Sequence, residues 1–132
     1  MLCIGVLGGM SWESTVSYYQ ALNRGVRERL GGLHSARILL HSVDFAEIER
    51  LQVQGDWEQA GQVLAKAARS LEAGGADFLL LATNTMHKVA PALEAAVSIP
   101  LLHIADATGA RLVRDGVRRV GLLGTRFTME QD

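Results

Sequence analysis

The stretch LLLATNTMH, at residues 79–87, decides the fold of this chain. An apolar run stops abruptly at a cluster of hydrogen-bonding side chains: Thr83, Asn84, Thr85 and His87. A short apolar run is typical of a strand buried on both faces, and its end delivers polar groups to the rim of a sheet. Residues 8–13, GGMSWE, make the same transition after the first apolar run. These two strand ends predict a site for a compact polar ligand.

Short apolar runs rich in Leu, Ile and Val recur along the chain and alternate with helical patterns. Parallel strands need crossover connections, so this alternation predicts an α/β fold, a doubly wound parallel sheet of about five strands. The predicted strands are residues 2–7, 37–43, 77–82, 99–104 and 118–123.

Local signals predict where the helices begin and end. The predicted starts are the N-cap Ser11, the capping box of Asp44 with Glu47, Pro91 in a first turn, and the cap Asp106. The first helix should bury a face from Thr15 to Leu30, and the third should carry Trp57. The predicted stops are Gly31-Gly32, Gly55-Asp56, Gly74-Gly75 and Gly116.

Length and charge limit the classes of partner. The 132 residues suffice for one domain with a hydrophobic core. Lys and Arg number 13 against 14 Asp and Glu, so the chain has no electrostatic footprint for nucleic acid or an anionic membrane. No apolar run approaches the roughly 20 residues that span a bilayer. We therefore expect neither a nucleic-acid nor a membrane partner.

Cys3 is the only cysteine, so the chain can form neither an internal disulfide nor a zinc site of the cysteine type. A cytoplasmic location is the default for such a chain. Residues 1–6 are apolar, but no basic stretch precedes them and Gly8-Gly9 ends the run early. We interpret this run as a first strand and not as a signal peptide.

Each motif has a structural interpretation beside a functional one. Gly8-Gly9 before a helix favours an anion such as a carboxylate or phosphate, although a tight strand-to-helix turn also explains it. Capping of the next helix explains one residue of the 83–85 cluster but not all of it. Spacing leaves His87 open as a surface residue or a proton-handling group. His103 indicates a hydrogen-bonded structural histidine, and Trp12 and Trp57 indicate core or interface aromatics.

Taken together, several segments resemble the aspartate/glutamate racemase family. These are GGMSWEST at 8–15, HSVDF at 41–45, TNTMH at 83–87, HIADAT at 103–108 and LGT at 123–125. The resemblance implies a cofactor-independent racemase of two similar α/β domains with the active site between them. Residues 1–132 would then be the first domain. The capping pattern from Thr128 to Gln131, just before the last residue, also predicts a fragment, with a short disordered tail as the alternative.

A racemase removes the α-proton from one face of its substrate and returns a proton on the other, so two acid/base groups flank the carbon. Cysteine suits this task because the pKa of its thiol is tunable toward neutrality. In cysteine-paired members of the family the first group directly precedes Asn-Thr, and that position here is Thr83. The sequence resembles a threonine-bearing subgroup, in which the hydroxyl would donate a hydrogen bond or relay a proton through water or His87. The second group, a cysteine of the other domain, has no counterpart here.

The resemblance also assigns substrate-binding residues by position. Met10 and Ser11 would line the pocket, Gln52 would contact the substrate, and Asn84, Thr85 and Thr125 would hold its carboxylates. It implies small acidic amino acids as substrates, a homo-oligomer, and no metal, pyridoxal phosphate or nucleotide. We expect negligible racemase activity from this chain alone. The alternatives are a non-catalytic domain that binds a dicarboxylate or phosphate, and an interaction fragment.

Overall fold

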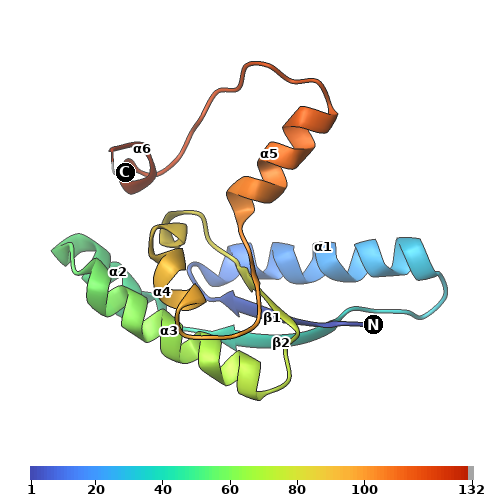
Figure 1. Cartoon of the computed structure of the whole chain (residues 1–132), viewed down its shortest axis with the longest axis horizontal. Helices are drawn as coiled ribbons and strands as arrows, with labels where there is room; N and C mark the ends of the chain where they lie inside the picture. Colours follow the sequence, from blue (N-terminus) through green and yellow to red (C-terminus); the bar gives the residue numbers. More distant parts are fainter. Residues whose placement is uncertain (131–132) are drawn as a thin grey trace.

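The computed structural model describes residues 1–130 and contains a four-stranded parallel sheet with helices on both faces (Figure 1). The sheet order is β2-β1-β3-β4. The strands are β1 (Cys3–Gly8), β2 (Arg37–Ser42), β3 (Phe78–Leu81) and β4 (Leu101–Leu102). This architecture confirms the predicted doubly wound α/β fold, because crossover helices separate all the strands.

Helices connect the strands in the expected places. α1 (Trp12–Leu30) joins β1 to β2, and α2 (Phe45–Gln54) with α3 (Trp57–Ala73) joins β2 to β3. A short 3-10 helix η1 (Thr85–Val89) continues into α4 (Ala90–Glu94) before β4. The chain then forms α5 (Ile104–Arg114) and, after a long arch, α6 (Arg126–Glu130) (Figure 1).

Alternation along the strands divides the apolar side chains between the two faces of the sheet. Leu7, Leu79 and Leu81 belong to the main core cluster, which they share with side chains of α2, α3, η1 and α4. On the other face, Ile4 and Leu80 line a groove with residues of α1. The face toward α2 and α3 is therefore buried, whereas Ile4 and Leu80 on the face toward α1 are half-buried, so the predicted burial of both faces is complete on one face only.

Helix ends largely follow the predicted signals. The Asp44 carboxylate accepts a hydrogen bond from the Ala46 backbone N at 3.1 Å, and that of Asp56 accepts from Gln59 N at 3.0 Å. Gly55 ends α2 in the left-handed conformation at φ 73°, which glycine adopts without steric cost. Ser11 occupies the N-cap position of α1 but, within residues 1–130, makes no side-chain cap bond. The predicted breaks between α2 and α3 and after α3 are confirmed.

The predicted fifth strand is wrong. Residues 118–123 lie outside the sheet in an exposed arch, and Leu123 is 94% exposed. The preceding strand explains the difference: the run predicted at 99–104 contributes only Leu101–Leu102 to the sheet. Two residues offer few backbone groups at the free edge, so little holds another strand there.

The predicted cap of α5 is also wrong. His103 is the N-cap, and its Nδ1 accepts from the Ala105 backbone N at 3.1 Å. Asp106 lies within the first turn, where its charge still complements the helix dipole. The helix that was expected to start at Thr128 starts at Arg126, and Gln131 lies outside the described residues.

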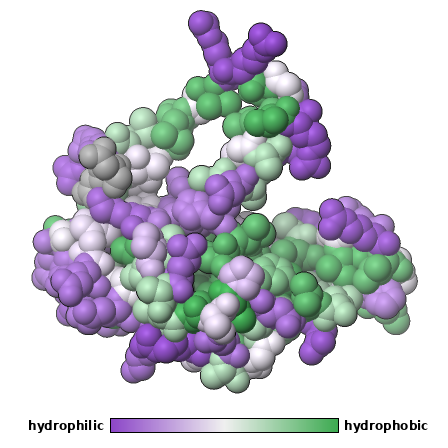
Figure 2. Space-filling view, in the orientation of Figure 1, coloured by the Kyte–Doolittle hydropathy of each residue, from purple (hydrophilic) through white to green (hydrophobic). Residues whose placement is uncertain are grey.

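The apolar face expected on α1 is mostly exposed. Thr15 is buried, but Tyr19 and Leu30 are 53% and 55% exposed. A groove of about 480 Å³ runs along this helix. Figure 2 shows hydrophobic residues at the surface below the arch between α5 and α6. Trp12 is 63% exposed and so is not a core residue, whereas Trp57 is half-buried against the core.

None of the helices in residues 1–130 combines the length and the apolar character needed to cross a bilayer.

We expect Gly9→Ala to cost much more stability than Gly31→Ala. Both glycines have positive φ, at 93° and 76°, so both substitutions pay a backbone strain of about 1–3 kcal/mol. A Cβ at Gly9 would also collide with the Val43 carbonyl and lie 2.7 Å from Val43 N, whereas Gly31 has open space. Urea denaturation of the two variants measures the difference. Equal losses would show that the close approach of Gly9 to Val43 is unimportant.

Candidate active site

The strands that carry the predicted site end at one level of the sheet. Gly8 pairs with Ser42 in β2, and Leu7 pairs with Leu81 in β3. The chain leaves β1 toward one side of the sheet and β3 toward the other, so the order reverses between them. Open α/β sheets bind ligands at this switch point, beyond the carboxyl ends of the strands.

A cavity of about 560 Å³ opens at this switch point. The structure brings together the predicted catalytic and substrate-binding residues, which all line this cavity: Met10, Ser11, Gln52, Thr83, Asn84, Thr85 and Thr125. Their roles in binding remain predictions. Phe45, the first residue of α2, also lines the cavity, and Asp44 before it is the N-cap of that helix.

Close packing of glycine against threonine shapes the turn after β1. The Gly9 N donates to the Thr15 hydroxyl at 2.9 Å, and that hydroxyl lies 3.2 Å from the Ser11 carbonyl, to which it donates. A Cβ at Gly8 would lie 2.6 Å from a carbon of the Thr15 side chain. The turn therefore requires glycine for steric reasons, and it holds Met10 and Ser11 over the end of β1.

Three threonine hydroxyls converge on the other side of the cavity. The oxygen of Thr85 lies 3.1 Å from that of Thr125 and 3.3 Å from that of Thr128. Hydroxyl hydrogens rotate, so each group can turn from its neighbour to donate to an oxyanion. In the described chain, Asn84 holds the N-cap position of η1 without a side-chain cap bond. The capping interpretation of this cluster is therefore wrong for Asn84, which is exposed at the cavity.

The Gln52 side chain is buried and hydrogen-bonded to Met86. It is 7% exposed, and its Nε2 donates to the thioether of Met86 at 2.9 Å. A thioether accepts hydrogen bonds and cannot donate, so this contact assigns the nitrogen of the amide to Met86.

His87 lies beneath the rim. Its Nδ1 lies 3.2 Å from the Asn84 carbonyl and its Nε2 accepts from Ile104 N at 3.3 Å, which assigns the proton to Nδ1. The ring meets that of His103 edge-on at 4.5 Å. Burial and the neighbouring charge of His103 lower the pKa of His87, and hydrogen bonds to the carbonyls of Asn84 and Thr83 partly oppose this. His87 thus joins the 83–85 turn to α5 as a neutral group.

His103 has the structural role that the sequence indicated, but as a helix cap instead of a strand residue. The predicted proton relay through His87 stays a prediction: the backbone engages both of its ring nitrogens, and the residues that line the cavity within the described chain do not include it.

Sequence reasoning missed several residues that line the cavity. Among them are Tyr18, Glu49 and Arg126. Helical spacing could have indicated two: Tyr18 lies two turns after Ser11, and Glu49 lies one turn before Gln52. Burial raises the pKa of Tyr18, so its phenol is a neutral donor at pH 7. Glu49 and Arg126 give the cavity one negative and one positive side chain.

Cys3 is buried at the start of β1, at the opposite end from the cavity. Within residues 1–130, no group of three His, Cys, Asp or Glu side chains is placed to hold a metal ion.

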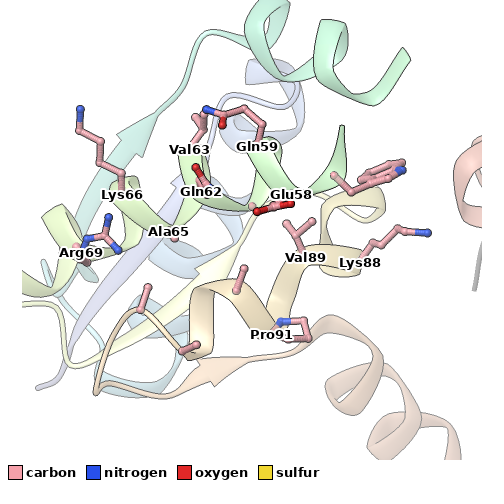
Figure 3. Close-up of a pocket in the computed structure, with 15 residues that line it drawn as sticks. Glu58, Gln59, Gln62, Val63, Ala65, Lys66, Arg69, Lys88, Val89 and Pro91 are labelled. Atoms are coloured by element: carbon pink, nitrogen blue, oxygen red, sulfur yellow. The ribbon is translucent and has the colours of Figure 1, made fainter. Parts of the chain in front are cut away.

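A larger groove of about 960 Å³ lies between α3 and α4, away from the strand ends (Figure 3). Small residues form its floor: a Cβ at Gly61 would lie 3.1 Å from that of Ala92. Lys66 and Arg69 extend outward along one side, as Figure 3 shows. The groove lacks the strand-end polar cluster, so its size alone does not make it the active site.

The chain matches known proteins along nearly all of its length. Residues 7–132 match the Asp/Glu/hydantoin racemase family. A crystal structure from Yersinia pestis, of a protein named as a candidate Asp/Glu racemase, is 57% identical with a TM-score of 0.94. An aspartate racemase homologue from Pyrococcus horikoshii OT3 is 31% identical with a TM-score of 0.81.

The chain spans only part of these neighbours. The match to the Yersinia protein covers 99% of this chain and 57% of the Yersinia chain. The match to the Pyrococcus protein covers 88% of this chain and 50% of the Pyrococcus chain. The fold and the rim define an α/β domain with a cavity at the carboxyl ends of its parallel strands, where open α/β sheets bind ligands. The family match is more specific: the chain belongs to the Asp/Glu/hydantoin racemase family.

We expect the pH dependence of stability to report on His87. Folding lowers the pKa of the His87 imidazole below its ordinary value of 6.5. As the pH falls below 6.5, the unfolded chain therefore binds a proton at His87 before the folded chain does. The stability conferred by the neutral ring is complete above pH 6.5 and declines as pH falls toward the folded pKa, with a slope of up to about 1.4 kcal/mol per pH unit.

Urea unfolding between pH 7.5 and 5 measures this slope. His87→Gln should flatten it, while His34→Gln, at an exposed histidine, should leave it unchanged. The same slope in His87→Gln and the unsubstituted chain would contradict the buried neutral assignment.

Proposed function

We propose that this chain is one half of a cofactor-independent racemase for small acidic amino acids. The observation that carries the proposal is the meeting of Met10-Ser11 and Thr83-Asn84-Thr85 around one cavity at the switch point of the sheet. Membership of the racemase family supports the reaction class. The greater length of the two solved neighbours supports a second domain that closes the site.

Thr83 is the group proposed for one face of the α-carbon. It follows β3 by two residues, is half-buried and lines the cavity. A hydroxyl is a poor base at neutral pH, so Thr83 would donate a hydrogen bond or pass a proton through water. A cysteine thiolate of the second domain would remove or return the α-proton on the other face. The two faces would then be unequal, with one strong base and one weak one.

The charges around the cavity suit an amino-acid zwitterion. Glu49 is placed to attract an α-ammonium group, and Arg126 a carboxylate. The hydroxyls of Thr85 and Thr125, with the Asn84 amide, supply neutral donors for carboxylate oxygens. A dicarboxylic amino acid uses both kinds of donor, which supports aspartate or glutamate as the substrate class.

A second candidate function is binding of a dicarboxylate or phosphate without turnover. The start of α1 favours it, because the N-cap Ser11 and Ser14 of the first turn line the cavity beside the positive end of the helix dipole. Calorimetry with aspartate, glutamate and phosphate, alongside a racemisation assay, separates the two functions. Binding of phosphate alone, with no inversion even when the second domain is supplied, would favour the binding domain.

We expect the 132-residue chain alone to exchange the α-hydrogen of aspartate and glutamate negligibly. One positioned acid/base group contributes about 10²–10⁴-fold, so the missing group should cost at least that factor. Thr83→Cys should not restore activity to this chain, but should raise activity or make it more symmetric when the second domain is present. Deuterium incorporation at the α-carbon of both enantiomers measures this.

Thr108→Cys is the control, because it adds a thiol at an exposed position of α5. Inversion by the unaltered chain would contradict the two-domain mechanism and direct attention to His87. Failure of Thr83→Cys to change the activity of the longer protein would contradict the role of Thr83.

We also propose that the protein forms a homo-oligomer and that it is located in the cytoplasm. The exposed apolar groove along α1 supports association, and the single cysteine supports a reducing compartment. Sedimentation over a concentration range tests the first. A monomer at all concentrations would contradict it.

A further inference from the structure

We propose that Trp57 and Phe127 form an aromatic clasp that positions Thr125 at the cavity. Trp57 would be a positioning residue, which acts on the ligand through Phe127 and Thr125. The identity of the ligand rests on the function proposed above, whereas the clasp itself does not.

The segment that brings Thr125 to the cavity has little support of its own. Side chains from Asp115 to Arg126 are exposed, and the strand expected within this segment does not form. The segment arches from α5 to α6 (Figure 1), and the space-filling view shows an opening beneath the arch (Figure 2). The first half-buried side chains after the arch are Phe127 and Thr128. The position of Thr125 therefore depends on what holds α6.

Trp57 provides a fixed surface for α6. It is the first residue of α3, is half-buried and packs against the main core. The ring of Phe127 meets it edge-on, with centroids 5.8 Å apart and planes at 77°. This is the arrangement that aromatic quadrupoles favour. Each ring also carries a cation: Lys88 Nζ lies 5.1 Å from the centroid of Trp57, and the guanidinium of Arg126 lies 5.9 Å from that of Phe127.

The clasp is adjacent to the hydroxyl cluster. Phe127 is two residues from Thr125 and directly precedes Thr128, and both hydroxyls lie near that of Thr85. Phe127 and Thr125 line the cavity, whereas Trp57 lies on the wall of the neighbouring groove. The hydroxyl pairs are exposed or only partly buried and so hold α6 weakly, and we assign the apolar support of this segment to the ring contact.

The first arm of the test measures the clasp without any ligand. In a Trp12→Phe background Trp57 is the only tryptophan, and its accessibility is read by iodide quenching. Phe127→Ala should raise the quenching constant, whereas Phe127→Tyr should preserve it because the ring remains. Met129→Ala is the matched control, since Met129 is on the same short helix and 50% exposed. Equal quenching in all these variants would overturn the proposal.

The second arm measures the consequence for the cavity. Titration with L-aspartate is followed through the methyl signal of Thr125 in the threonine-labelled chain. Phe127→Ala and Trp57→Ala should each shift that signal and weaken aspartate binding by roughly two- to tenfold, the range expected for one aromatic pair. Trp57→Phe should restore both values, because it keeps a ring at the contact.

The two arms separate failure of the clasp from failure of the proposed function. If the unsubstituted chain binds no aspartate, that result contradicts the proposed function. The iodide quenching and the methyl signal of Thr125 then still show whether the clasp exists. If aspartate binds with equal affinity to all the variants and the Thr125 signal does not move, Trp57 has no positioning role.

Discussion

The parallel pairing of β1 with both β2 and β3 is the constraint on which the rest of the structure depends. Two backbone hydrogen bonds extend this pairing past the strand ends: Val43 N donates to the Gly8 carbonyl at 3.0 Å and Ala82 N to that of Leu7 at 2.9 Å. They continue the ladder to the residues that enter the rim. A shift of the register by one residue would turn Leu79 and Leu81 out of the core and move Thr83 away from Met10.

Packing and hydrogen bonds below the rim then hold it in place. Thr15 fills the space left by Gly8 and bonds the backbone of Gly9 and Ser11. His87 ties the turn after β3 to the start of α5, and Met86 holds the amide of Gln52. Buried polar groups of this kind are stable only when they are paired, so the packing below the cavity also determines its shape. The cavity is therefore preorganised on the side of β1 and β3.

The opposite wall is built differently. Thr125 arrives at the end of an exposed arch, and no strand of the described sheet continues into that segment. In the proposed two-domain racemase, the second domain would face this open side. The rim is thus held by the sheet, whereas the position of this wall depends on α6.

The sequence by itself determined the α/β class, the strands β1 to β3 and the polar groups that follow them. Apolar runs and glycine breaks are local signals that locate the strands. The carboxyl ends of parallel strands meet at one edge of the sheet, where ligands bind. The sequence therefore predicted a shared position for the residues after β1 and β3, namely Met10, Ser11, Thr83 and Asn84. Which apolar runs join the sheet depended on contacts between distant segments. Residues 120–123 form a short apolar run, but a strand exists only if a neighbour offers paired backbone groups, and β4 offers two residues. The burial of His87 and the ring contact of Trp57 with Phe127 could not be predicted from the sequence either. Both depend on the packing of segments that are distant along the chain, and such packing leaves no periodic signal in the sequence.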